Sequence, residues 1–144
     1  MERFKMIACG YGLFIRDDKI LLVRRSKTGY MDGFYGLPSG HIEDNEPLTQ
    51  GTLRELLEET GVALSSKNIR LVHIMHRRST DIRMDFFFEV SDWKTDPINT
   101  EPDKCDDMRW FALDSLPENV IPYIEIALQN VQHNIFYSEL GWKA

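Results

Sequence analysis

Residues 40–62 read GHIEDNEPLTQGTLRELLEETGV and hold five glutamates. Pro47 suits the first position of a helix, because the missing N–H of proline is not needed there. Gly61 suits the position just past the end of a helix. The stretch therefore predicts a helix from about Pro47 to Thr60.

The predicted helix has two different faces. At about 100° per residue, Glu55, Glu58 and Glu59 fall within an arc of about 100°. Three leucines fall on the other side, and one face is therefore predicted to pack in a core: Leu53, Leu56 and Leu57. A solvated acidic face usually carries Lys or Arg four residues after each glutamate. Here Glu55 is followed at that spacing by Glu59, and Glu58 is followed by a valine.

Like charges at this spacing repel one another, and a divalent cation is the compensation that the pattern indicates. All candidate ligands are oxygen atoms and no cysteine is nearby, which favours Mg²⁺ or Mn²⁺ over zinc. The stretch lacks the ligand spacing of an EF-hand loop, which argues against a calcium sensor. The sequence therefore predicts a site for a hard divalent ion on the acidic face.

The stretch resembles the signature of the Nudix hydrolases, G-x5-E-x7-R-E-U-x-E-E-x-G-U, in which U is a bulky aliphatic residue. Every fixed position is matched, namely Gly40, Glu46, Arg54, Glu55, Leu56, Glu58, Glu59, Gly61 and Val62. The resemblance implies a single Nudix domain over residues 1–144 with its motif at residues 40–62. It also implies an α/β fold, the Nudix α/β/α sandwich with a mixed, partly closed sheet.

The resemblance further implies roles for the matched residues. The metal ligands would be Glu55, Glu58 and Glu59, the backbone carbonyl of Gly40 and, more loosely, Glu46. Arg54 would orient a motif glutamate through an ion pair. Metal ions at such a site neutralise phosphate oxygens and lower the pKa of a bound water, so the expected reaction is hydrolysis of a phosphoanhydride. The general base would come from the motif, which includes Glu58, or from a loop outside it, where Glu101 is the candidate.

A second region narrows the substrate. Residues 98–111, INTEPDKCDDMRWF, resemble the corresponding stretch of MutT-type nucleoside triphosphate pyrophosphohydrolases. We therefore expect a nucleoside monophosphate and pyrophosphate as products. Two alternatives stay open: a hydrolase of nucleoside diphosphate derivatives such as ADP-ribose or a nucleotide sugar, and a non-catalytic nucleotide sensor. The first is weakened because no proline lies between Val62 and Asp96, and the second because no motif glutamate is lost.

Residues outside the motif could contact the rest of a nucleotide. Arg24, Arg25 and Lys27 leave a predicted strand towards the expected cleft and could hold phosphates, although solvated charges at a strand end are an equal interpretation. Tyr35 and Tyr123 could stack on a base, against the alternative of packing in the core.

Composition limits the remaining function classes. The chain has 144 residues, a net charge of −6, 42% hydrophobic and 28% charged residues, which is typical of one globular domain. The negative charge argues against polymeric nucleic acid, whose binding relies on surplus Lys and Arg. No secretory segment or membrane-crossing apolar run is present, and Cys9 and Cys105 form no disulfide framework. We expect a cytoplasmic protein that acts on a small nucleotide, as a monomer or a homodimer.

Hydrophobic patterns predict the other elements. A hairpin is expected from residues 5–15 and 19–24, a loop over 28–40, strands over 69–77, 83–90 and 107–112, and a long loop over 92–107. Beyond Pro117, apolar residues at helical spacing predict a C-terminal amphipathic helix: Ile124, Leu128, Val131 and Ile135.

Overall fold

The computed structural model describes residues 1–143. Its strands are β1 (Ile7–Arg16), β2 (Lys19–Arg25), β3 (Tyr35–Gly36), β4 (Ser39–His41), β5 (Ile69–Arg78), β6 (Ile82–Val90), β7 (Cys105–Ala112) and β8 (Tyr137–Leu140). Two α-helices, α1 (Leu48–Thr60) and α2 (Pro122–Gln132), and one short 3-10 helix at Ser66–Asn68 complete the fold.

The strands form one mixed sheet in the order β3-β2-β1-β6-β5-β8, with β4 paired to β1 and β7 paired to β2. The long strand β1 joins the two halves of this sheet. It runs parallel to β6 along most of its length and pairs with β2 only at its end, beside the hairpin turn. The mixed sheet that we expected is confirmed, and it does not close on itself.

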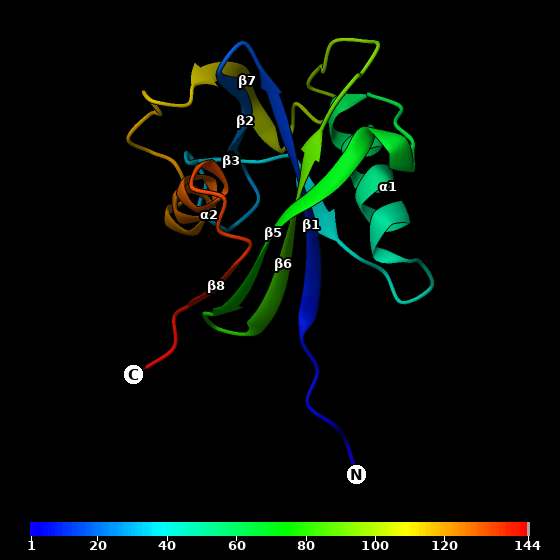
Figure 1. The fold of residues 1–144 in the computed structure, drawn as a ribbon, viewed down its shortest axis with the longest axis vertical. Helices are drawn as coiled ribbons and strands as arrows, with labels where there is room; N and C mark the ends of the chain where they lie inside the picture. The colour runs from blue at the N-terminus through cyan, green and yellow to red at the C-terminus, as the bar shows by residue number, and fades with distance from the viewer. Residues whose placement is uncertain (144) are drawn as a thin grey trace.

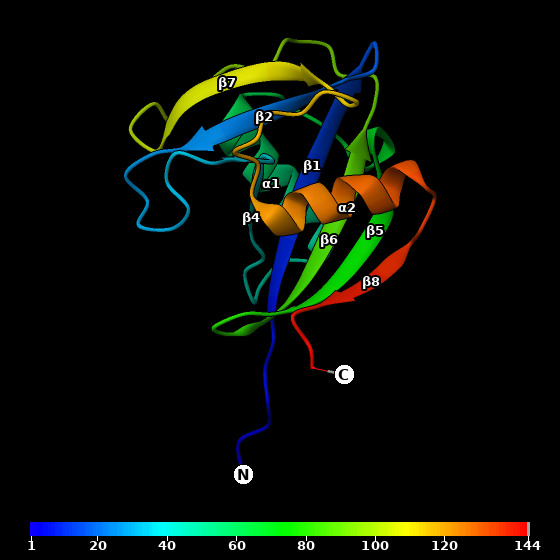
Figure 2. The ribbon, with the colours of Figure 1, turned by 90° about the vertical axis from the view of Figure 1, so that its left-hand side faces the viewer.

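The two helices cover opposite faces of the sheet. In Figure 2, α2 crosses in front of β1, β5 and β6 while α1 lies behind them, and Figure 1 shows the same helices on either side of the strands. The three-layer arrangement that we expected is therefore present. The β2–β7 half runs across one end of the molecule, above α2 in both views.

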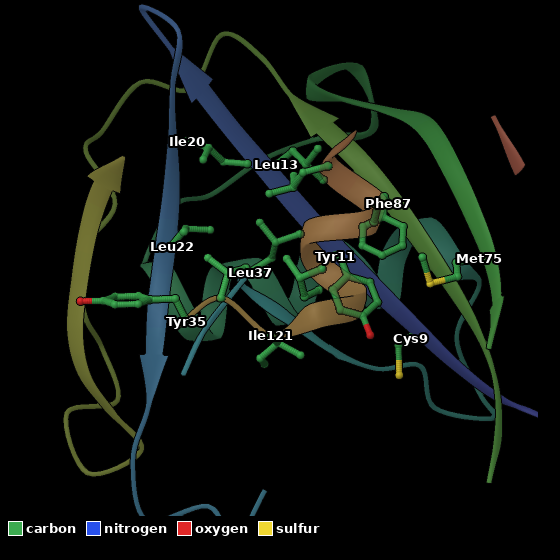
Figure 3. Close-up of a cluster of buried hydrophobic side chains, with 14 residues drawn as sticks. Cys9, Tyr11, Leu13, Ile20, Leu22, Tyr35, Leu37, Met75, Phe87 and Ile121 are labelled. Atoms are coloured by element: carbon green, nitrogen blue, oxygen red, sulfur yellow. The ribbon is translucent and has the colours of Figure 1, made fainter. Parts of the chain in front are cut away.

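Each face of β1 has its own core. Towards α2, Leu13 packs with Phe87 and Ile124, and all three are fully buried. Figure 3 shows this larger cluster between the strands and α2. On the other face, Phe14 and Leu56 form a smaller core with three further residues, Leu21, Val62 and Val90. Residues 9–14 are buried throughout because the strand is covered on both sides.

Helix α1 lies close to the backbone of β1. Gly10 and Gly12 face the helix, where a Cβ on Gly10 would overlap the side chain of Thr52. A Cβ on Gly12 would lie 2.6 Å from Cδ2 of Leu56, which is nearer than carbon atoms approach one another. Two positions without side chains therefore let α1 pack directly onto the strand.

The expected hairpin and the expected motif helix are confirmed. Asp17 and Asp18 form the turn with positive φ values of 54° and 61°, which short polar side chains tolerate best. Pro47 caps α1 rather than beginning it, and Gly61 ends it in the left-handed region at φ 73°.

Three expectations about other elements were incomplete. The loop expected over residues 28–40 contains β3 and most of β4, and β7 begins at Cys105 rather than at Asp107. Helix α2 ends at Gln132, so Ile135 lies beyond it, before a strand β8 that the pattern did not predict. Within residues 1–143, neither helix has the length and apolarity needed to cross a bilayer.

Candidate active site

One large cleft, with a volume of about 750 Å³, opens beside the acidic face of α1. Glu55, Glu58 and Glu59 line it together, as the spacing along the helix predicted. Their leucine neighbours behave differently from one another, because Leu53 and Leu56 are buried while Leu57 is about half exposed. The helix therefore presents its carboxylates to a cavity, although one of the three leucines predicted for the core lies at the surface.

Arg54 is the centre of an ion-pair network at the edge of this cleft. Its Nη2 donates to Glu46 Oε1 at 2.7 Å, and its Nη1 lies 2.9 Å from Glu55 Oε1 and 3.3 Å from Glu58 Oε2. The pKa of Glu46 falls to about 2, because its carboxylate accepts from the Arg54 guanidinium and from the N–H of Glu43. The expected orienting role of Arg54 thus has a geometric basis.

Glu46 itself does not line the cleft. Its carboxylate lies over Gly51, where a Cβ would be 2.6 Å from Glu46 Oε1. Both of its oxygens are used by Arg54, through Nε at 3.0 Å and Nη2 at 2.7 Å. In this arrangement Glu46 positions Arg54, and its proposed contact with a metal remains a prediction.

Glu59 and Glu55 lie deeper than the rest of the acidic face. Burial raises the pKa of Glu59 to about 8, although the N–H of Ser39 donates to both of its oxygens at 3.2 and 3.3 Å. Burial also raises the pKa of Glu55, and its Arg54 partner opposes that effect. Burial is the main cause for Glu59, and the neighbouring carboxylates of Glu55 and Glu101 oppose its ionisation further.

The residues present fit a hard divalent ion. All donors are oxygens, the carboxylates of Glu55 and Glu101 oppose the ionisation of Glu59, and a Cβ on Gly40 would overlap the carboxylate of Glu55. The absence of a side chain at Gly40 therefore leaves room for the Glu55 carboxylate against this residue. In the described chain, no three Asp, Glu, His or Cys side chains already converge to enclose an ion, and Arg54 forms ion pairs with Glu46, Glu55 and Glu58.

Basic side chains line another part of the cleft. Six Lys and Arg side chains line the cleft, and four of them lie at the end of β2, just after it or just before β7, namely Arg24, Arg25, Lys27 and Lys104. Arg24 Nε donates to Asp106 at 2.7 Å, while Arg25 is fixed by the carbonyl of Tyr30 at 2.7 Å. The cleft therefore combines acidic and basic groups, which a phosphate chain with a metal ion would need. Arg24 and Arg25 were predicted from the sequence, whereas Lys104 was not.

Glu101 lines the same cleft from a separate loop. This loop is fixed to the C-terminal end of α1, because the Thr100 hydroxyl donates to the carbonyl of Glu58 and the Ile98 N–H donates to that of Thr60. The Glu101 carbonyl accepts from two N–H groups, those of Lys104 and Cys105, each at 2.9 Å. The fold thus brings Glu101 to the acidic helix from more than 40 residues away in the chain.

The two tyrosines proposed for base stacking have different positions. Tyr123 lines the cleft, and its hydroxyl lies 3.0 Å from that of Tyr11. Tyr35 is 4% exposed and does not line the cleft; its hydroxyl donates to Asp107 on β7. In Figure 3 the Tyr35 hydroxyl points away from the other labelled side chains. Its position favours the core-packing interpretation over base stacking.

The sequence analysis did not predict a buried ion pair that contributes to the cleft. Arg77 and Asp85 form an ion pair of 2.7 Å with almost no exposure, and Arg77 lines the cleft. Arg77 stands in a run of polar residues that reads as the end of a strand at the surface. The ion pair could be recognised only from the pairing of β5 with β6, which brings the two side chains together.

Comparison with known proteins finds relatives of this chain. The model of the NUDIX domain family matches residues 7–130. An 8-oxo-dGTP diphosphatase of Proteus vulgaris is 30% identical over 98 residues, which cover 67% of this chain and 85% of that protein. The NAD-capped RNA hydrolase NudC of Shigella dysenteriae is 30% identical over 107 residues, or 74% of this chain. The match covers only 39% of NudC.

A solved structure is also similar over most of its length. The crystal structure of a MutT NUDIX hydrolase from Burkholderia pseudomallei superposes with a TM-score of 0.79 at 28% identity. The match covers 88% of this chain and 98% of that one. The similarity extends over both halves of the sheet and is not confined to the acidic helix.

Proposed function

Because this chain belongs to the Nudix hydrolase family, we propose that it is a Mg²⁺-dependent enzyme that splits a nucleoside triphosphate into a nucleoside monophosphate and pyrophosphate. One observation carries the proposal, the cleft in which three glutamates of one helix meet six Lys and Arg side chains. The similarity to an 8-oxo-dGTP diphosphatase supports the choice of a triphosphate substrate.

The acidic residues would hold the metal and direct the water. Glu55, Glu58 and Glu59, with the carbonyl of Gly40, are the proposed ligands, and Mn²⁺ would fit the same oxygen donors. The bound ion would neutralise phosphate oxygens and activate a water molecule. Arg54 would keep Glu55 and Glu58 at the cleft by the ion pairs that it already makes.

Groups outside the motif would handle the substrate and the proton. Arg24 and Arg25, which stand at the end of β2, would bind the phosphate oxygens that the metal does not neutralise. Glu101 would accept the proton of the attacking water, since it lines the cleft on a loop fixed to α1. Tyr123 would lie beside the nucleoside.

One observation favours a second candidate, a hydrolase of nucleoside diphosphate derivatives. The similarity to an NAD-capped RNA hydrolase extends over 74% of this chain. Such a substrate carries the same type of diphosphate bond between different groups, so the same metal site would serve. The difference would lie in the part of the cleft that receives the second nucleoside or the sugar.

Product analysis separates these possibilities. Nucleoside triphosphates, ADP-ribose and NADH are incubated with the protein and Mg²⁺ in ¹⁸O water, and the products are identified by mass spectrometry. We expect pyrophosphate and nucleoside monophosphate from triphosphates, and little turnover of the other two. Orthophosphate and nucleoside diphosphate as main products would refute the proposed reaction. Preferred turnover of ADP-ribose or NADH would favour the second candidate.

A further inference from the structure

A second part of the cleft is built on β1, β5, β6 and α2 around the guanidinium of Arg77. Arg77 Nε donates to Asp85 Oδ2 at 2.7 Å, and its Nη2 lies 3.5 Å from Asp85 Oδ1. The hydroxyl of Tyr11 donates to the same Oδ1 at 2.8 Å. The Cζ of Arg77 lies 3.6 Å from the centre of the Tyr123 ring. The guanidinium is therefore held in one orientation from two sides.

One edge of this guanidinium keeps its donors free. Among residues 1–143, Arg77 makes its hydrogen bonds through Nε and Nη2 to Asp85, none is made by Nη1, and Nη2 meets Asp85 with only one of its two hydrogens. Nη1 is not sealed in the core, because the one fully buried and unpartnered polar side-chain atom in the described chain belongs to Trp93. Arg77 lines the cleft with a side chain that is 6% exposed, and the edge without partners would be the part that meets this space.

The charge of the pair determines what this edge can bind. Asp85 is fully buried and neutralises Arg77, so the pair as a whole attracts anions weakly. Phosphates have better partners in the same cleft, the cations at the end of β2. The free edge presents two parallel N–H donors, which match two adjacent neutral acceptors.

Nucleobases differ in this respect. Guanine offers O6 and N7 side by side, and cytosine offers O2 and N3. Adenine and uracil have a donor next to each acceptor on their accessible edges. We propose that Arg77 is a specificity-determining residue that selects guanine or cytosine nucleotides by a bidentate hydrogen bond. This inference rests on the proposed function, and it narrows the base of the substrate to two of the four, a choice for which the sequence offered no signal.

The fixed orientation of the Arg77 side chain favours selective binding of a base. An arginine at a surface loses several rotatable bonds when it binds, whereas Arg77 is already fixed by Asp85 and by the ring of Tyr123. Its donors would be left unpaired by a base that lacks the two acceptors, and sites of that kind reject such analogues strongly.

The test compares four nucleotides and two matched variants. Turnover of GTP, CTP, ATP and UTP is measured with Mg²⁺, together with the affinity of their α,β-methylene analogues. In the variant Arg77→Met with Asp85→Asn, both charges are removed together, because removing one would leave the other buried and unpaired. The control is Arg70→Met with Glu89→Gln, which removes an exposed pair across the same two strands.

We expect the wild type to favour GTP or CTP over ATP and UTP by about tenfold or more in kcat/KM and in affinity. The deaza analogue of the preferred base, 7-deaza-GTP or 3-deaza-CTP, should lose about the same factor. The Arg77 variant should lose both differences, and the Arg70 control should keep them. A melting curve of each variant verifies folding.

Several outcomes would overturn the inference. Equal kcat/KM values and affinities of the wild type for the four nucleotides would do so, as would a base preference that is retained in the Arg77 variant. If the deaza analogue of the preferred base is hydrolysed equally well, a residue other than Arg77 must recognise that base. If no triphosphate is hydrolysed, the proposed function fails, and the affinities of the methylene analogues still decide whether Arg77 selects the base.

Discussion

The carboxylate of Glu59 should make the metal-free protein less stable as the pH rises. Its pKa is raised by burial to about 8 in the folded chain, against an ordinary value of 4.5. Between these values the folded state holds a proton that the unfolded state has lost, so the stability of the folded state decreases with pH. One pH unit corresponds to about 1.4 kcal/mol for a single group. From about pH 5 to about pH 7, Glu59 should therefore cost roughly 2–3 kcal/mol.

Urea unfolding in the presence of EDTA measures this effect, with Glu59→Gln as the matched variant. Glutamine has nearly the same shape and still accepts from the Ser39 N–H, but it does not titrate. We expect the difference in unfolding free energy between the two proteins to move in favour of the variant by roughly 2–3 kcal/mol over that range. A constant difference would refute the reasoning that Glu59 is protonated in the metal-free protein. Added Mg²⁺ should stabilise the wild type most at the higher pH, because binding requires the ionised carboxylate.

Three further predictions concern turnover and the helix end. Glu58→Gln should remove most activity with little change in melting temperature, and a folded variant with normal turnover would exclude Glu58 as a ligand. Glu101→Gln should lower kcat by about 10²-fold with smaller changes in nucleotide affinity. If the measured kcat changes by no more than about threefold, the general base must instead be a residue of α1. Gly61→Ala should destabilise the protein by about 1–2 kcal/mol in urea titrations, because the left-handed φ of 73° opposes a Cβ; an unchanged unfolding midpoint would contradict this.

Local signals account for the elements that were predicted well. The motif helix is set by Pro47, Gly61 and an amphipathic repeat, all of which act within one segment of chain. The first hairpin depends on Asp17 and Asp18, which tolerate the turn conformation. Such features are visible in the sequence because each is decided by neighbours a few residues away.

The elements that were missed depend on distant partners. Strand β8 has four residues and exists because the edge of β5 is available to pair with it. His73 on β5 also holds the segment, through the Ile135 carbonyl at 2.7 Å and the Ser138 hydroxyl at 2.8 Å. No periodicity within residues 137–140 carries that information.

The candidate site divides in the same way. The spacing of Glu55, Glu58 and Glu59 correctly predicted that the three side chains lie together on one face of α1, and all three line the cleft. Arg77 was missed because its importance comes from Asp85 on the neighbouring strand and from a ring on α2. Tyr35, which resembled a stacking residue in the sequence, is held in the core by Asp107.

The two side-chain-free positions of β1 decide how high the acidic helix stands above the sheet. Alanine at Gly10 or Gly12 would push against Thr52 or Leu56 and lift α1 together with every carboxylate on it. A genetic screen for loss of activity should therefore return alleles at these glycines, although neither would touch a nucleotide in the proposed site. Substitutions at these two positions would therefore alter the spacing of the site without replacing any acidic residue.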